Sequence, residues 1–242
     1  STQGYSSAAS DVYKRQALLS ATMPFTAKAQ DKVEASVGAD FVSNYIWRGT
    51  DCGGVSIQPS MGVSYKGLSL TAWGSVGIDK EDAREIDLTL GYNTGGFSVS
   101  VTDYWFSYHK EDGGYTGDYF KYGAHSTVHI FEATLGYDFG PLALSWNTYF
   151  AGDDYTKENG DRAYSTYVGI SAPFKLGGLD WSAEVGLTPW EGAYANKFNV
   201  TNLTLKAEKE IKFTNSFSLP TFAQVTFNPH TQGAYFVFGV SF

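Results

Sequence analysis

The stretch Gly233–Phe242 (GAYFVFGVSF) decides the fold of this chain. Alternate residues of an extended strand share a face, and one face here is wholly apolar: Phe236, Phe238, Val240 and Phe242. A water-soluble protein gains little from ending a strand on an exposed phenylalanine. A barrel in a lipid bilayer gains an aromatic residue for the lipid interface and a final strand that can close against the first. The stretch therefore predicts the last strand of a membrane-spanning β-barrel.

The composition agrees with such a barrel. The chain has 242 residues, of which 43% are hydrophobic and 17% aromatic, with 27 glycines and a mean hydropathy of −0.23. No run approaches the ~20 consecutive apolar residues of a transmembrane helix. The formal net charge of −8 makes nucleic acid an unexpected partner. Because Cys52 is the single cysteine, an internal disulfide is excluded, and we interpret it as a tolerated thiol in a surface loop.

Period-two alternation of apolar and polar residues persists along the chain. Glu85–Tyr92 places Ile86, Leu88, Leu90 and Tyr92 on one face, and Leu179–Leu187 and Phe131–Phe139 repeat the pattern. This pattern predicts half-buried strands and excludes a helical fold. We expect about twelve strands. They lie near residues 33–47, 55–66, 67–78, 84–94, 96–109, 126–139, 141–151, 162–174, 178–187, 198–213, 216–228 and 233–242.

The predicted connections alternate in length. Even-numbered strands end in short turns such as Lys66-Gly67 and Gly140-Pro141, whereas odd-numbered strands end in longer polar loops such as Gly49–Gly54 and Lys110–Ala124. An even strand count with short turns at one rim and long loops at the other is typical of outer-membrane barrels. The sequence therefore predicts an all-β, transmembrane, antiparallel up-and-down barrel with short periplasmic turns and longer extracellular loops.

Aromatic residues gather beside the predicted short turns, as the girdle of a barrel would: Tyr65, Tyr92, Phe97, Tyr137, Phe139, Phe174, Phe213, Phe217 and Phe242. A second group sits near the long loops: Tyr45, Trp47, Trp105, Tyr164 and Trp190. One segment does not fit the alternation, because the apolar face of Phe97–His109 meets Asp103 while Tyr104 takes the opposite side. A β-bulge near Thr102-Asp103 would restore the register.

The first 29 residues are interpreted separately from residues 30–242, the predicted barrel. Asp11–Gln16 (DVYKRQ) looks like a translated sequencing adapter, so residues 1–16 are interpreted as an assembly artefact. Ala17–Ala29 resembles the remnant of a signal peptide, with a small-x-small site at its end. Cleavage there predicts a mature chain that begins at Gln30.

Two resemblances point to one compartment. The terminal stretch Phe236–Phe242 resembles the C-terminal insertion signal of bacterial outer-membrane barrels, and Ser43–Gly49 (SNYIWRG) resembles the segment that ends the first strand of TorF-type porins. The resemblances imply a porin-like barrel in the outer membrane of a Gram-negative bacterium. They imply outer-membrane lipid, lipopolysaccharide, the barrel-assembly machinery and small solutes as partners. The loops depart from the family pattern, so family selectivity is not carried over.

Charged residues recur on the faces predicted to point inward, and a water-filled interior could hold them where a dry core could not. Carboxylates in a lumen attract cations, so we expect a porin-like channel for passive diffusion of small solutes with a mild preference for cations. A plugged interior, cross-braced by Arg48, Lys206 and Lys212, is an equal alternative. The predicted pore-lining residues are Glu34, Asp40, Arg48, Glu85, Asp87, Glu132, Asp180, Glu184, Lys206 and Glu208.

Other function classes carry weaker signals. A non-conducting structural or adhesion barrel stays open as an alternative, and an outer-membrane lipid hydrolase stays open through His129, predicted on the lipid side. No G-x-S-x-G segment, phosphate loop or Cys/His metal spacing appears, so we predict no enzyme, no cofactor and no metal. The acidic stretch Asp153–Asp161 lacks calcium-loop spacing and is interpreted as a solvated loop. Lys110–Ala124 could bind a sugar, fold inward as a constriction or form a surface loop tip.

Overall fold

A computed structural model describes residues 32–110, 114–214 and 217–242 of the chain. The predictions of an assembly artefact over residues 1–16 and of a signal-peptide remnant over 17–29 lie outside the described residues. Among the described residues, no helix is long and apolar enough to cross a membrane.

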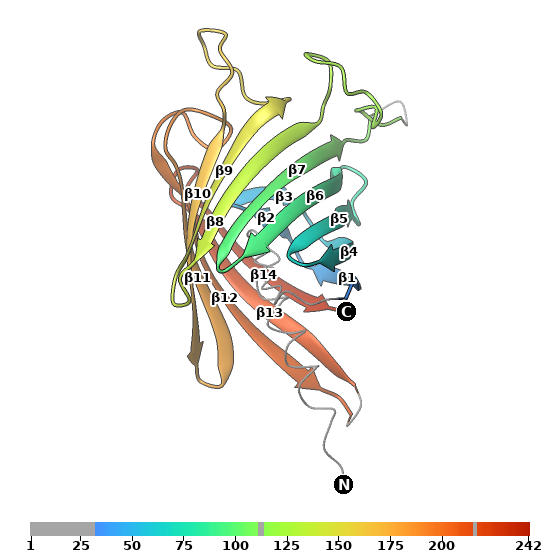
Figure 1. Cartoon of the computed structure of the whole chain (residues 1–242), viewed down its shortest axis with the longest axis vertical. Helices are drawn as coiled ribbons and strands as arrows, with labels where there is room; N and C mark the ends of the chain where they lie inside the picture. Colours follow the sequence, from blue (N-terminus) through green and yellow to red (C-terminus); the bar gives the residue numbers. More distant parts are fainter. Residues whose placement is uncertain (1–31, 111–113, 215–216) are drawn as a thin grey trace.

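Twelve strands form a closed antiparallel barrel (Figure 1), and two further strands form a separate hairpin. The barrel strands are β1 (Glu34–Val42), β4 (Ser56–Tyr65), β5 (Leu68–Gly77), β6 (Arg84–Thr94), β7 (Phe97–Ser107), β8 (Ile130–Asp138), β9 (Ala143–Gly152), β10 (Thr166–Leu176), β11 (Leu179–Thr188), β12 (Asn199–Lys212), β13 (Ser218–Asn228) and β14 (Gly233–Ser241). The hairpin strands are β2 (Tyr45–Trp47) and β3 (Thr50–Gly53).

Each barrel strand pairs with its neighbours along the chain, and β1 closes the barrel against β14. Closure is short: Asp40, Phe41 and Val42 face Ser241, Val240 and Gly239, whereas β1 pairs with β4 over its full length. The predicted antiparallel barrel of about twelve strands is confirmed. So is the alternation of connections, with two-residue turns such as Lys66-Gly67 at one rim and long loops such as 108–129 at the other.

The outer surface of the barrel is apolar. Phe236, Phe238 and Phe242 are exposed while Val237 between them is buried, so the facing predicted for the last strand is confirmed. The same alternation leaves Leu88 and Leu90 of β6 exposed. The girdle aromatics beside the short turns are all exposed: Tyr65, Tyr92, Phe97, Tyr137, Phe139, Phe174, Phe213, Phe217 and Phe242. An apolar belt bordered by aromatic rings is the surface that lipid covers in transmembrane barrels.

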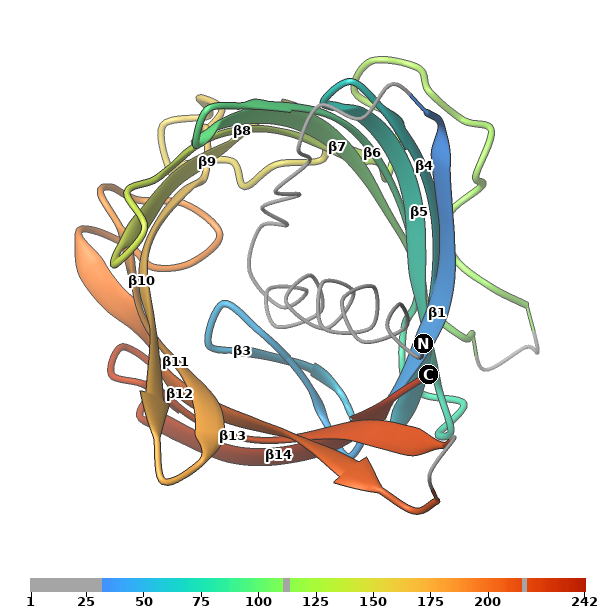
Figure 2. The same ribbon diagram turned by 60° about the horizontal axis from the view of Figure 1, so that its bottom comes forward.

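The first predicted strand, near residues 33–47, is wrong in its second half. β1 ends at Val42, and the chain turns inward so that β2 and β3 lie within the barrel (Figure 2). The amide of Phe238 donates to the Ser43 hydroxyl and the Ser43 amide donates to the Phe238 carbonyl, which fixes this turn to β14. Gly49–Gly54, predicted as a long polar loop at the rim, therefore belongs to the hairpin inside the barrel. Tyr45, which packs on Trp73, and Trp47 lie inside the barrel rather than in a girdle.

The predicted β-bulge near Thr102-Asp103 is also wrong. β7 pairs with β6 and β8 without a register shift, and Asp103 stays on the outward side. Thr102 and Tyr104 on either side of it are buried and face inward. Register shifts lie elsewhere in the barrel: between β8 and β9, where Phe131 pairs with Ala151 and Glu132 with Tyr149, and between β11 and β12 at Gly186 and Leu187. Asp103 needs no bulge because a histidine outside the barrel binds its carboxylate.

A charge on the outer wall tests this orientation. We expect Leu90→Arg to destabilise the folded barrel by about 2–4 kcal/mol in lipid vesicles, because a guanidinium would face the acyl chains. Ser100→Arg, on the inward face of β7, is the matched control and should cost far less. Chemical denaturation followed by heat-modifiable gel mobility measures both. Equal destabilisation by the two variants would contradict the assigned faces.

Candidate functional site

A tight turn connects the two strands of the hairpin inside the barrel. Trp47 pairs with Thr50, so Arg48 and Gly49 form a two-residue connection, and both have positive φ (50° and 80°). Two successive left-handed residues define the turn type that matches the twist of a hairpin. A Cβ on Gly49 would lie 2.0 Å from the carbonyl oxygen of Thr201, so the turn also requires glycine for its approach to β12.

The tip of the hairpin rests on the barrel wall at β12 and β13. The side-chain amide of Asn228 on β13 donates to the Gly49 carbonyl oxygen at 3.0 Å. With Ser43 fixed to β14, the hairpin is held at both ends. It therefore presents the Arg48 side chain toward the lumen from a fixed position.

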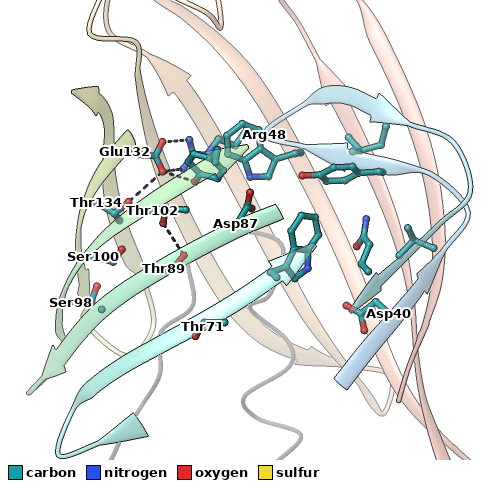
Figure 3. Close-up of a pocket in the computed structure, with 18 of the residues that line it drawn as sticks. Asp40, Arg48, Thr71, Asp87, Thr89, Ser98, Ser100, Thr102, Glu132 and Thr134 are labelled. Atoms are coloured by element: carbon teal, nitrogen blue, oxygen red, sulfur yellow. Dashed lines mark hydrogen bonds and ion pairs between the residues drawn. The ribbon is translucent and has the colours of Figure 1, made fainter. Parts of the chain in front are cut away.

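Arg48 makes a bidentate ion pair with Glu132 of β8. Its Nη1 lies 2.6 Å from Oε2 and its Nη2 lies 2.9 Å from Oε1 (Figure 3). Both residues are buried, with 7% and 1% exposure. The guanidinium also lies over the rings of Trp47 (4.3 Å) and Tyr167 (4.8 Å). Paired, hydrogen-bonded and stacked, the two charges are stabilised where water is excluded.

Four buried tyrosines surround the ion pair. Tyr104 donates to Glu132 at 2.9 Å, and Arg48 donates to the Tyr194 hydroxyl at 2.6 Å. The Tyr194 hydroxyl in turn donates to Tyr149 at 3.2 Å. We call Trp47, Arg48, Tyr104, Glu132, Tyr149, Tyr167 and Tyr194 the lumen cluster. Its polar and aromatic side chains fill the barrel at the level of the hairpin.

Tyr194 belongs to the connection between β11 and β12, outside the barrel strands. Its neighbour Ala195 is buried too, so this connection enters the barrel beside the hairpin. Burial raises the pKa of Tyr194 to about 12. The hydroxyl therefore keeps its proton at neutral pH and can donate to Tyr149.

A second network extends the cluster toward β11 and β12. Tyr167 donates to Glu184 at 2.5 Å, and the Asn202 side-chain amide donates to Glu184 and to the Tyr167 hydroxyl at 3.0 Å each. Glu184 thereby accepts two hydrogen bonds inside the barrel. It braces the interior rather than facing open water.

A cavity of about 200 Å³ lies on the short-turn side of the lumen cluster. Figure 3 shows hydroxyl side chains from neighbouring strands directed into it. These are Thr71, Thr89, Ser98, Ser100, Thr102 and Thr134, and Ser69 lines the cavity as well. Trp73, Tyr45 and Gln58 also line the cavity, together with apolar side chains such as Phe222 and Val237, so its wall is mixed in polarity and its hydroxyl groups can bind water and small polar solutes.

The predicted pore-lining residues separate into two groups. Five line the cavity: Asp40, Arg48, Asp87, Glu132 and Lys206. The others lie elsewhere. Glu85 is buried beside Asp87 on β6, Glu184 joins the network with Tyr167, and Glu208 pairs with Lys206 at 2.8 Å. Glu34 is half-buried at the start of β1. Asp180 is exposed next to the β10–β11 turn and pairs with Lys175, so it takes no part in the cavity.

Sequence reasoning missed the tyrosines of the lumen cluster and the row of hydroxyls. Tyr149 and Tyr167 occupy inward positions of regular strands, where a large ring signals a filled lumen. Tyr104 carried the same signal but was attributed to a bulge. Cys52, predicted in a surface loop, is half-buried in β3. Among the described residues, no group of three or more His, Cys, Asp or Glu side chains could hold a metal ion.

Comparison with solved structures finds matches of low sequence identity. BamA from Haemophilus ducreyi lacking POTRA domains 1–3 matches with a TM-score of 0.38 and 11% identity, over 81% of this chain and 41% of that one. CdiB from Acinetobacter baumannii matches with a TM-score of 0.40 and 13% identity, over 88% of this chain and 60% of that one. This chain thus spans less than two thirds of either protein. No protein-family model and no curated protein sequence matches it.

The Arg48–Glu132 pair predicts a large stability effect. We expect Arg48→Ala to lower the free energy of unfolding by about 3–5 kcal/mol, because it leaves the Glu132 carboxylate buried without its partner. Arg48→Ala combined with Glu132→Ala should lose less than the sum of the single variants. Lys175→Ala, which removes one partner of an exposed pair, should cost about 0–1 kcal/mol. Denaturant unfolding in detergent measures Arg48→Ala, Glu132→Ala, the double variant and Lys175→Ala. A negligible loss of stability for Arg48→Ala would refute the coupling between Arg48 and Glu132.

Proposed function

We propose that the chain is a porin-like channel of the bacterial outer membrane for passive diffusion of small solutes, narrowed by the β2–β3 hairpin. One observation carries this proposal. A cavity with hydroxyl and carboxyl groups on its wall lies inside a barrel whose outer surface is apolar. A water-soluble barrel would have no use for a polar interior and an apolar exterior. In a membrane, the same arrangement provides a path for water-soluble molecules.

The outer surface supports the membrane location. Val37, Met61 and Phe236 are among the most exposed side chains of the barrel strands, at 84%, 62% and 68%. Large apolar patches on a protein surface mark contact with another apolar phase. Closed barrels are the one sheet architecture that spans a bilayer without an open edge. We propose outer-membrane lipid and lipopolysaccharide as the surroundings, with insertion by the barrel-assembly machinery.

The charges on the cavity wall support a mild preference for cations. Arg48 and Lys206 are the basic residues of the wall, and each is paired with a carboxylate. Asp40 and Asp87 take part in no ion pair of the described residues. The charged residue types on the wall that lack an ion pair are therefore both carboxyl groups, which favour cations over anions when they are ionised.

The lumen cluster sets the width of the path. Its side chains are buried against one another, so passage beyond the cavity requires a shift of the hairpin or of the β11–β12 connection. We therefore expect small conductance steps from the native barrel. Because the lumen cluster fills the barrel at this level, the second candidate, a non-conducting structural or adhesion barrel, is supported as well.

A lipid hydrolase receives less support. Both ring nitrogens of His129 are engaged, Nδ1 with Asp103 and Nε2 with the Tyr119 carbonyl oxygen. A serine hydrolase needs a hydroxyl at one of these nitrogens. We propose no enzymatic role.

Planar-bilayer recording of the refolded barrel tests the channel. We expect small steps from the native protein and larger steps from Arg48→Ala combined with Glu132→Ala, because the brace across the lumen is removed. Lys175→Ala combined with Asp180→Ala removes an exposed pair at the short-turn rim and should leave the steps unchanged. Heat-modifiable mobility shows whether the native protein and the double variant both fold. If both fold and neither passes current, the channel proposal is wrong and the non-conducting structural barrel is favoured.

Selectivity is tested separately. Under a KCl gradient we expect a reversal potential that favours K⁺, and a smaller one after Asp40→Asn combined with Asp87→Asn, because the unpaired wall charges are then gone. Asp180→Asn is the matched control outside the cavity. An unchanged reversal potential in the double variant would contradict the assigned selectivity wall.

A further inference from the structure

The connection after β7 folds against the outside of the barrel. Residues 114–128 of this connection are called the outer loop (Figure 2). The Tyr119 ring meets Trp105 of β7 edge-on at 5.4 Å, and a Cβ on Gly117 would lie 2.9 Å from Phe106 backbone. The loop therefore neither enters the lumen as a constriction nor stands free of the wall.

An ion pair fastens the outer loop to the wall. His129 is completely buried, with Nδ1 2.7 Å from Asp103 Oδ1 and Nε2 2.7 Å from the Tyr119 carbonyl oxygen. The His129 ring therefore bridges the outward Asp103 side chain and the backbone of the outer loop.

Aromatic rings run without a break from the barrel wall into the loop. Phe150 and Phe131, on the outward side of β9 and β8, lie 6.4 Å apart, and Phe131 lies 6.4 Å from Tyr122. Tyr122 also stacks on His129 at 4.2 Å. Tyr122 then leads to Tyr119 (6.5 Å), and Tyr119 to Phe120 (5.1 Å). The loop is therefore a continuation of the apolar belt.

The far end of this row is unprotected from solvent. Phe120 is 90% exposed, the largest value among the exposed hydrophobic side chains, and Lys121 beside it is exposed as well. Nothing in the barrel requires a phenylalanine at this position. An aromatic ring next to a lysine is the pairing that membrane–water interfaces favour, with the ring among acyl chains and the ammonium at the phosphates.

We propose that the outer loop is a lipid anchor. Phe120 inserts into the leaflet at the long-loop rim, beside the apolar belt, and the Asp103–His129 pair holds the loop at that depth. The occupant of this surface is the acyl-chain and headgroup region of the bilayer. The role does not depend on whether the lumen conducts.

Spin-label accessibility tests the anchor. In a Cys52→Ser background, Phe120→Cys carries a nitroxide in barrels refolded into phosphatidylcholine vesicles. We expect more collisions with oxygen than with nickel–EDDA, because oxygen concentrates in lipid and the nickel complex stays in water. Glu158→Cys, on the exposed connection after β9, is the matched control and should show the opposite order.

Two results would overturn the proposal. A Phe120 label as accessible to nickel–EDDA as the Glu158 label would place the loop in water. A label protected from both reagents would show a protein partner or a second copy of the chain instead of lipid.

The ion pair is tested with the same label. His129→Gln removes the ring that bridges Asp103 and the Tyr119 carbonyl but keeps a polar side chain, and we expect the Phe120 label to become more accessible to nickel–EDDA. Heat-modifiable mobility should show that the barrel itself still folds. Unchanged label depth in this variant would refute the role of His129 in holding the loop.

Discussion

Closure of the sheet is the constraint on which the rest of the structure depends. A membrane offers no water to unpaired backbone groups, so β1 must meet β14 and every other strand must keep two neighbours. That requirement divides each strand into an outward face for lipid and an inward face for polar side chains. The closing contact is short, joining Asp40–Val42 to Gly239–Ser241. The chain uses the space beside it to turn inward at Ser43, which is where the hairpin begins.

Inside the barrel, charge is balanced locally rather than left to water. Arg48 comes from the hairpin, Glu132 from β8 and Tyr194 from the β11–β12 connection, and their contacts join segments far apart in sequence. Each would be costly to bury alone. Together they close one level of the lumen while the cavity beyond it keeps Asp40 and Asp87 free of ion pairs. A narrow, cation-preferring path and a braced interior are therefore compatible in one barrel.

On the outer wall of the barrel, a single acidic residue is also held by a partner side chain. Asp103 interrupts the apolar face of β7. A lone carboxylate that faces lipid is costly, so the sequence analysis predicted a β-bulge that would take Asp103 off this face. The structure keeps the register and brings His129 and the outer loop to the carboxylate instead. A hydrogen-bonding partner 26 positions away has no local signature in sequence. The error at Asp103 and the failure to place the outer loop thus have one cause.

The sequence by itself determined the barrel, its strand count, the facing of residues such as Phe236 and Leu90, and the difference between the two rims. These follow from period-two alternation and turn residues, which act over a few neighbouring positions. It also brought four of the charged residues that line the cavity, Asp40, Asp87, Glu132 and Lys206, into view by strand parity, whereas Arg48 lies in the hairpin turn. Only the tertiary structure decided that Ser43–Gly53 turns inward, that Arg48 pairs with Glu132, and that Asp103 pairs with His129. Those outcomes depend on contacts between side chains that are far apart in the sequence, and local sequence patterns do not predict such contacts.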